Sequence, residues 1–176
     1  MRKTVVKYGL ISGGILAVLT AIHVPLVMNG TIDMSYGQLI GYTAMVLSFL
    51  AVFFGIRSYR ESTGGAITFG KAFKVGILIT LINCAVYVIG WEIVFWGFIP
   101  DFGDKYAAMA LDKMRAEGAP AEEIAATEKQ MASFKEWYKN PFLNVGITFL
   151  EVFPVGLIVT LVSAAILRRK PELAPA

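Results

Sequence analysis

The stretch that decides the fold of this chain is FKVGILITLINCAVYVIGWEIVFWGF, residues 73–98. Beyond Lys74 at its start, it contains one charged residue, Glu92. A helix of about twenty apolar residues crosses the hydrocarbon core of a bilayer, so this stretch is long enough to span a membrane. Cys84, near its centre, is the only cysteine, which excludes an intrachain disulfide and favours a packing role for the thiol.

The composition places the whole chain in the membrane class. Of its 176 residues, 56% are hydrophobic and 16% charged, and the mean hydropathy is +0.64. Three further apolar runs, at about 8–28, 38–56 and 142–167, flank the central one. We therefore predict an all-α polytopic membrane protein with four transmembrane helices in one domain. The tail Pro171–Ala176 is expected to be disordered.

Small residues follow one face of the first two predicted helices. Gly9 and Gly13 are four residues apart in the first, whereas Gly41, Ser48 and Gly55 recur every seven residues in the second. Such faces let helix backbones approach closely inside a membrane, where no hydrophobic force draws helices together. They predict a compact bundle, and a face left free would suit contact with a second copy of the chain.

The distribution of charge predicts the orientation. Ten Lys and Arg residues flank the first run, the connection after the second and the end of the fourth, whereas six lie in residues 100–140 beside eight acids. Because cytoplasmic loops are rich in Lys and Arg, we expect both termini in the cytoplasm. The bases of the short connection are expected to contact lipid headgroups, and they are Arg57, Arg60, Lys71 and Lys74.

The long connection is predicted to form an extracytoplasmic helical hairpin at about 101–139. Gly118 is a stop signal for its first helix, and Pro120 suits the first turn of the second. In that second helix Phe134 and Tyr138 share an apolar face with Ile124 and Met131. The hairpin is therefore expected to lie against the membrane surface or over the bundle.

Four motifs carry a family resemblance: KYGLISG at 7–13, IRSYR at 56–60, ITFGKAFK at 67–74 and PDF at 100–102. With them the chain resembles domain-of-unknown-function family 4199, a family of bacterial membrane proteins. The resemblance spans nearly the whole chain and implies a bacterial inner-membrane protein with four crossings. It implies no activity, cofactor or catalytic residue.

Three ionisable residues lie inside apolar runs: His23, Glu92 and Glu151. Counted from the nearest basic anchors and at about 1.5 Å per residue, they lie at roughly 24, 27 and 25 Å depth. All three therefore fall in one layer, just inside the boundary of a core of about 30 Å. Asn144 and Thr148 share a helix face with Glu151 and extend it into a polar stripe. Together these five residues are a candidate site for a proton, a cation or a small cationic ligand.

Structural roles are the alternatives to this binding-site hypothesis. Trp91, Phe95 and Trp96 around Glu92 resemble an interfacial aromatic belt, so this carboxylate can reach headgroups or water. His23, close to a helix end, suits a capping or interfacial role. For Glu151, function and a structural hydrogen bond are open alternatives. Asn83 lies half a turn away from Glu92 around the helix and is interpreted as a helix-to-helix hydrogen bond.

The types of residue in the sequence argue against an enzyme, a metal-binding protein and a nucleic-acid-binding protein. One histidine and one cysteine within apolar runs give no nucleophile and base in a solvated cleft, and no close-spaced metal ligands occur. Bases come in short clusters beside membrane helices, which disfavours nucleic-acid binding. We therefore expect a non-enzymatic accessory or structural protein without a cofactor, whose partners are the bilayer and a second membrane protein or copy. The alternative is a proton- or cation-coupled transporter or channel subunit using Glu151, Glu92 and His23, which at four crossings requires a homo-oligomer.

Overall fold

The structure is a computed structural model that describes residues 1–169. It consists of six helices: α1 (Arg2–Met28), α2 (Met34–Ser62), α3 (Phe69–Phe98), α4 (Phe102–Ala116), α5 (Ala121–Lys139) and α6 (Pro141–Leu167). Four of them, α1, α2, α3 and α6, are long and apolar enough to cross a membrane. This confirms the predicted all-α class and the predicted number of helices able to span a membrane. The tail expected to be disordered lies outside the described residues.

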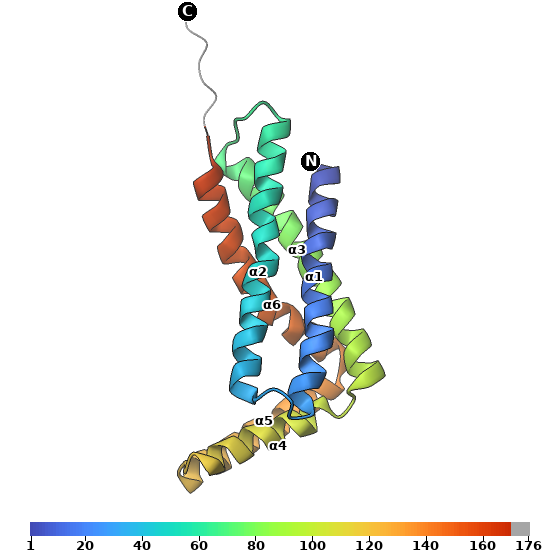
Figure 1. Cartoon of the computed structure of the whole chain (residues 1–176), viewed down its shortest axis with the longest axis vertical. Coiled ribbons are helices and arrows are strands. Elements are labelled where there is room, and N and C mark those ends of the chain that lie inside the picture. Colours follow the sequence, from blue (N-terminus) through green and yellow to red (C-terminus); the bar gives the residue numbers. More distant parts are fainter. Residues whose placement is uncertain (170–176) are drawn as a thin grey trace, which may run out of the picture.

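The four spanning helices form a bundle, and α4 and α5 cross one of its ends (Figure 1). The N-terminus, the α2–α3 connection and the end of α6 lie at the opposite end (Figure 1). Helix α3 contacts α1, α2 and α6, and among the helices able to span a membrane it is the most buried, so it lies at the centre of the bundle. We call the part of the bundle next to α4 and α5 the hairpin half.

Helices α2 and α3 begin before the predicted apolar runs, and polar caps lie at their starts. The side chain of Asp33 accepts the backbone N–H of Ser35 at the start of α2, and that of Thr68 accepts the N–H of Lys71 at the start of α3. Helix α2 therefore begins four residues before the predicted run and continues to Ser62. Helix length here follows capping as well as hydropathy.

The small-residue faces pack inside a single bundle. A Cβ at Gly9 would lie 2.6 Å from Ile82 on α3, and one at Gly13 would lie 2.7 Å from Val86 on the same helix. Gly55 likewise faces Ile79, and Gly41 lies beside the ring of His23. These faces therefore serve contact between the helices of one chain, and a homo-oligomer, which stays a prediction, requires a different surface.

Buried hydrogen bonds join the helices near the centre of the bundle. The Ser12 hydroxyl on α1 donates to the carbonyl of Ser48 on α2 at 2.7 Å, and the amide of Asn83 on α3 donates to that same hydroxyl. Farther along α3, the hydroxyls of Thr80 and Thr160 pair at 2.9 Å and link α3 to α6. The helix-to-helix role predicted for Asn83 is confirmed.

The hairpin packs on the bundle through aromatic rings. Tyr138 of α5 and Phe102 of α4 form one cluster with Trp91 and Phe95 of α3. The turn between the two hairpin helices contains Gly118, which adopts a φ of +73° that suits glycine. Helix α5 begins at Ala121, one residue after Pro120. The hairpin thus packs on the end of the bundle, and its position relative to a membrane surface stays a prediction.

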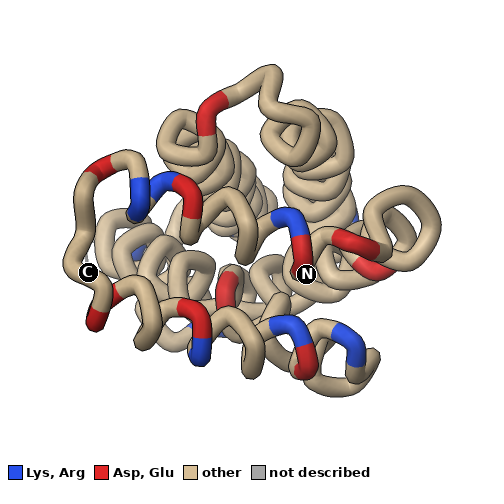
Figure 2. Tube along the Cα trace, turned by 90° about the horizontal axis from the view of Figure 1, so that it is seen from below, with Lys and Arg blue, Asp and Glu red and all other residues tan. Residues whose placement is uncertain are grey.

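Ion pairs hold the two hairpin helices together. Lys135 of α5 lies 2.8 Å from Asp104 of α4, and Arg115 lies 3.1 Å from Glu128. The hydrogen bond from Lys135 holds the pKa of the Asp104 carboxyl below its usual range. Lys, Arg, Asp and Glu are spread along the whole hairpin (Figure 2). Its outer surface is therefore polar, as expected for a segment outside the hydrocarbon core.

Two of the bases at the opposite end have partners within the protein. Arg57 pairs with Glu61 at 2.8 Å, and Arg60 donates to the carbonyl of Leu167 at the end of α6. Lys71 and Lys74 are exposed on the first turns of α3. Contact of these four bases with lipid headgroups stays a prediction.

Candidate functional site

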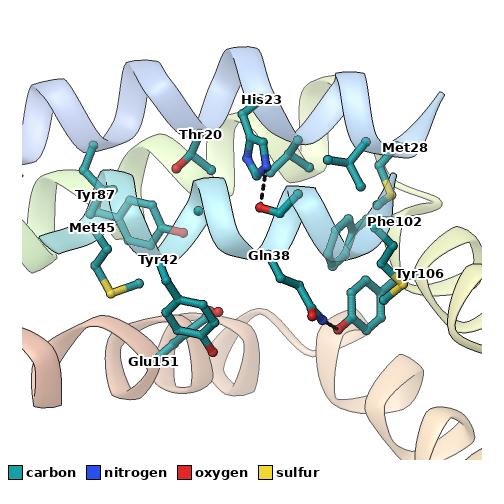
Figure 3. Close-up of a pocket in the computed structure, with 16 residues that line it drawn as sticks. Thr20, His23, Met28, Gln38, Tyr42, Met45, Tyr87, Phe102, Tyr106 and Glu151 are labelled. Carbon is teal, nitrogen blue, oxygen red and sulfur yellow. Dashed lines mark hydrogen bonds between the residues drawn. The ribbon is translucent and has the colours of Figure 1, made fainter. Parts of the chain in front are cut away.

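A cavity of about 200 Å³ lies in the hairpin half of the bundle (Figure 3). Helices α1, α2, α3, α4 and α6 all contribute to its wall. Most of the lining is apolar, and the polar members are Thr20, His23, Gln38, Tyr42, Tyr87, Tyr106 and Glu151. An apolar cavity with a few convergent polar groups is the usual form of a small-molecule site.

Glu151 is the one residue of this wall with a formal negative charge, and Lys and Arg are absent from it. Tyr42 extends from α2 toward α6, and Glu151 extends from α6 toward α2 (Figure 3). The Glu151 side chain is exposed, and within residues 1–169 it has no hydrogen bond or ion pair. The cavity therefore contains a carboxylate that the described chain leaves unpaired.

A second cavity, of about 440 Å³, adjoins the first between the hairpin and α6. Glu151, Phe102 and Tyr106 line both cavities, so the carboxylate lies where they meet. Tyr138 of α5 is on the second wall. Burial raises the pKa of its phenol above the usual value, and the negative charge of Glu151 adds to this effect. Glu151 thus acts electrostatically on both cavities.

His23 shares the first cavity with Glu151, but one of its nitrogens is already occupied. Its Nε2 lies 2.8 Å from the carbonyl oxygen of Gly37 on α2. Because a carbonyl only accepts, Nε2 carries the proton and donates. The ring therefore ties α1 to α2, and Nδ1 is the nitrogen with acceptor capacity in the neutral form.

Glu92 lies apart from this site and lines neither cavity. Its Oε2 accepts the indole N–H of Trp96, one turn farther along α3, at 2.8 Å. Its Oε1 is buried without a hydrogen-bond partner in the described chain. The structure therefore brings together two of the three intramembrane ionisable residues, His23 and Glu151, and separates Glu92 from them.

Asn144 and Thr148 are buried between helices rather than placed on a cavity wall. The side-chain oxygen of Asn144 accepts from the indole of Trp91 at 3.1 Å and from the hydroxyl of Thr148 at 3.2 Å. Its amide donates to the carbonyl of Tyr138 at 3.3 Å. Asn144 therefore connects α3, α5 and α6, a structural function.

The sequence analysis missed the tyrosines that line the cavity. Gln38, Tyr42 and Met45 follow a helical spacing of four and three on α2, and the small residue Gly41 lies on the same wall. This pattern of polar and aromatic residues within an apolar run was the available signal. No group of three His, Cys, Asp or Glu residues in the described part of the chain has the geometry of a metal site.

Comparison with known proteins gives one finding on the family. Residues 7–169 match the family described as "Protein of unknown function (DUF4199)". Comparisons with curated proteins and with solved structures gave no match. The matched region includes all four motifs on which the resemblance was based and the four helices able to span a membrane, apart from the first residues of α1. The chain therefore belongs to the DUF4199 family.

Proposed function

We propose that this protein binds a proton or a cation at Glu151 within the membrane, as a non-enzymatic subunit of a proton- or cation-coupled transport system. The observation that supports this is the unpaired carboxylate at the junction of the two cavities. A carboxylate among transmembrane helices is costly to keep charged, and such residues commonly belong to ion or proton pathways. His23 lies on the same wall and offers its Nδ1 as a second polar group beside Glu151.

Other polar residues of the transmembrane helices differ from Glu151 because they have hydrogen-bond partners within the protein. Asn144 and Thr148 are engaged with protein partners, and one of the two carboxylate oxygens of Glu92 accepts from an indole. A purely structural carboxylate at Glu151 would be expected to have such a partner as well, because an unpaired charge at membrane depth is costly. Its orientation toward two cavities instead favours an external positive partner.

The second candidate is the accessory or structural function favoured by the sequence. The hairpin reaches beyond the edge of the bundle (Figure 1) and carries exposed charges of both signs along its length. Such a surface suits contact with another protein. A homo-oligomer is compatible with either function.

A carbodiimide experiment tests the binding proposal. Dicyclohexylcarbodiimide modifies carboxyl groups in apolar membrane surroundings, and we expect it to label the purified full-length protein at Glu151. Glu151→Gln is expected to lose this label, whereas Glu92→Gln is expected to keep it, since Glu92 lies outside both cavities. Peptide mass spectrometry identifies the labelled residue and its yield.

The opposite labelling result would contradict the binding proposal. A Glu151 that stays unlabelled while the reagent modifies carboxyls of the hairpin would mean that the cavity does not present this carboxylate. The proposal would then fail, and the accessory function would take its place.

We further propose that the protein lies in a bacterial inner membrane with both termini in the cytoplasm. The excess of Lys and Arg at the end that contains the N-terminus supports this orientation. The hairpin is then extracytoplasmic. The aromatic residues Trp96, Phe98 and Trp137, which are exposed near the hairpin, suit a level close to the lipid headgroups.

Cysteine labelling tests this orientation. In a Cys84→Ala background, Ala121→Cys places a thiol at the start of α5 and Thr63→Cys places one in the α2–α3 connection. A membrane-impermeant maleimide is expected to label position 121 in intact cells and position 63 only after lysis. The reverse pattern would place the hairpin in the cytoplasm.

A further inference from the structure

We infer that the ligand of the Glu151 site is a singly charged organic cation with an apolar body, such as a protonated or quaternary amine. This inference rests on the proposed function and narrows it to one class of ligand. It follows from the charge, the chemistry and the position of the residues that line the two cavities.

The charge of the site selects a monocation. Across both cavity walls Glu151 is the single acidic residue, and Lys and Arg are absent. One carboxylate balances one positive charge in surroundings of low polarity, whereas a second charge on the ligand would stay uncompensated. An anionic ligand would meet Glu151 with no Lys or Arg on either wall to balance it.

The lining disfavours an inorganic ion. Dehydrated inorganic cations need a shell of several oxygen ligands, as six to eight around Ca²⁺ or the carbonyl rings of cation channels. The walls are formed mainly by carbon and sulfur, and the described residues contain no cluster of three metal ligands. Hydrophobic contact with an organic body suits such walls better than coordination does.

Aromatic rings and methionines match the organic part of the ligand. Tyr42, Tyr87, Phe102 and Tyr106 line the first cavity, and the faces of such rings attract cations. Met28, Met34 and Met45 lie on the same wall, and their flexible thioethers adapt to ligands of different shape. Ammonium recognition uses such groups of aromatic rings, and here they share the cavity with a carboxylate.

The position of the site favours a lipophilic ligand. Tyr42 on α2 is 58% exposed, and Leu150, which lines the second cavity on α6, is 65% exposed. Both residues belong to helices able to span a membrane, so the cavities reach the lipid-facing surface of the bundle. A cation with an apolar body concentrates in the membrane and can enter from there.

The test uses benzyltrimethylammonium and its uncharged isostere neopentylbenzene as probes. Binding to the full-length protein in detergent is measured by intrinsic fluorescence and by protection of Glu151 from carbodiimide. We expect benzyltrimethylammonium to bind and protect, and neopentylbenzene to do neither at the same concentration. Glu151→Gln is expected to weaken binding by about 30-fold or more, and Glu92→Gln to leave it unchanged.

Two variants of Tyr42 probe the aromatic contribution. Tyr42→Phe keeps the ring face and is expected to retain affinity, whereas Tyr42→Leu is expected to lose about 2- to 30-fold. Gel filtration of each variant shows whether it remains folded. Equal affinity in the Phe and Leu variants would remove cation–π attraction at this ring from the argument.

The outcomes separate this inference from the proposed function. If carbodiimide labels Glu151 but benzyltrimethylammonium neither binds nor protects, the carboxylate serves a proton or an inorganic ion and the inference is overturned. If the isostere binds as tightly as the cation, the site recognises apolar shape alone and the inference is again overturned. If Glu151 is not labelled and no probe binds, the proposed function fails as well.

Discussion

Gly13→Leu is expected to prevent folding of most of the protein, whereas Gly14→Leu, one residue away, is expected to leave it folded. A Cβ at Gly13 would lie 2.7 Å from the Cβ of Val86 and 2.9 Å from the carbonyl oxygen of Asn83. The second contact is with backbone, so relief requires α1 to move away from α3. Overpacking of a close helix contact costs about 1–3 kcal/mol for small changes and more where backbone must shift.

Gly14 provides a matched control because nothing lies within 4 Å of the position that its Cβ would take. Leucine also has the higher helix propensity, so Gly14→Leu is expected to be neutral or stabilising by up to about 1 kcal/mol. The measurement is the yield of monodisperse protein in detergent and its thermal midpoint. Equal stability of the two variants would show that the Gly9 and Gly13 face does not pack on α3.

Asn144→Leu is the second change with a large expected effect. It leaves the indole N–H of Trp91 and the carbonyl of Tyr138 without their partners in a buried region. Each such loss costs about 1–3 kcal/mol, so we expect destabilisation by about 2–5 kcal/mol. Thermal unfolding monitored by tryptophan fluorescence reports it, since Trp91 is one of the affected groups.

Val145→Leu, at an exposed position on the next residue, is the control and is expected to be neutral. Folded protein recovered from Asn144→Leu is expected to bind benzyltrimethylammonium like the unchanged chain. A stable Asn144→Leu protein that has lost this binding would return Asn144 to the binding site and remove its structural role.

The length of the apolar runs predicted most of the fold because only a few backbone structures are stable inside a membrane. Backbone polar groups must be satisfied within each segment, so a long apolar run in a bilayer becomes a helix. The apolar run at 73–98 and the three other apolar runs therefore predicted α1, α2, α3 and α6. Helix ends were less accurate, since Asp33 and Thr68 extend α2 and α3 beyond the apolar runs.

The candidate site was predictable in part. Depth along each helix follows from residue counts, which predicted similar levels for His23 and Glu151, and these two residues line one cavity. Helical spacing also placed Asn144, Thr148 and Glu151 on one face. It did not show that Trp91 covers Asn144, because that contact depends on how α3 is rotated against α6.

By itself, then, the sequence determined that four apolar helices exist, which residues share each face and how deep each polar group lies, since these properties depend on chemistry local to one helix. Only the tertiary structure decided which polar groups meet. It gave Glu92 the indole of Trp96, gave Asn144 three partners and left Glu151 unpaired at the junction of two cavities. The physical reason is that the partners of a side chain are set by the packing and rotation of neighbouring helices, which steric fit across the whole bundle determines.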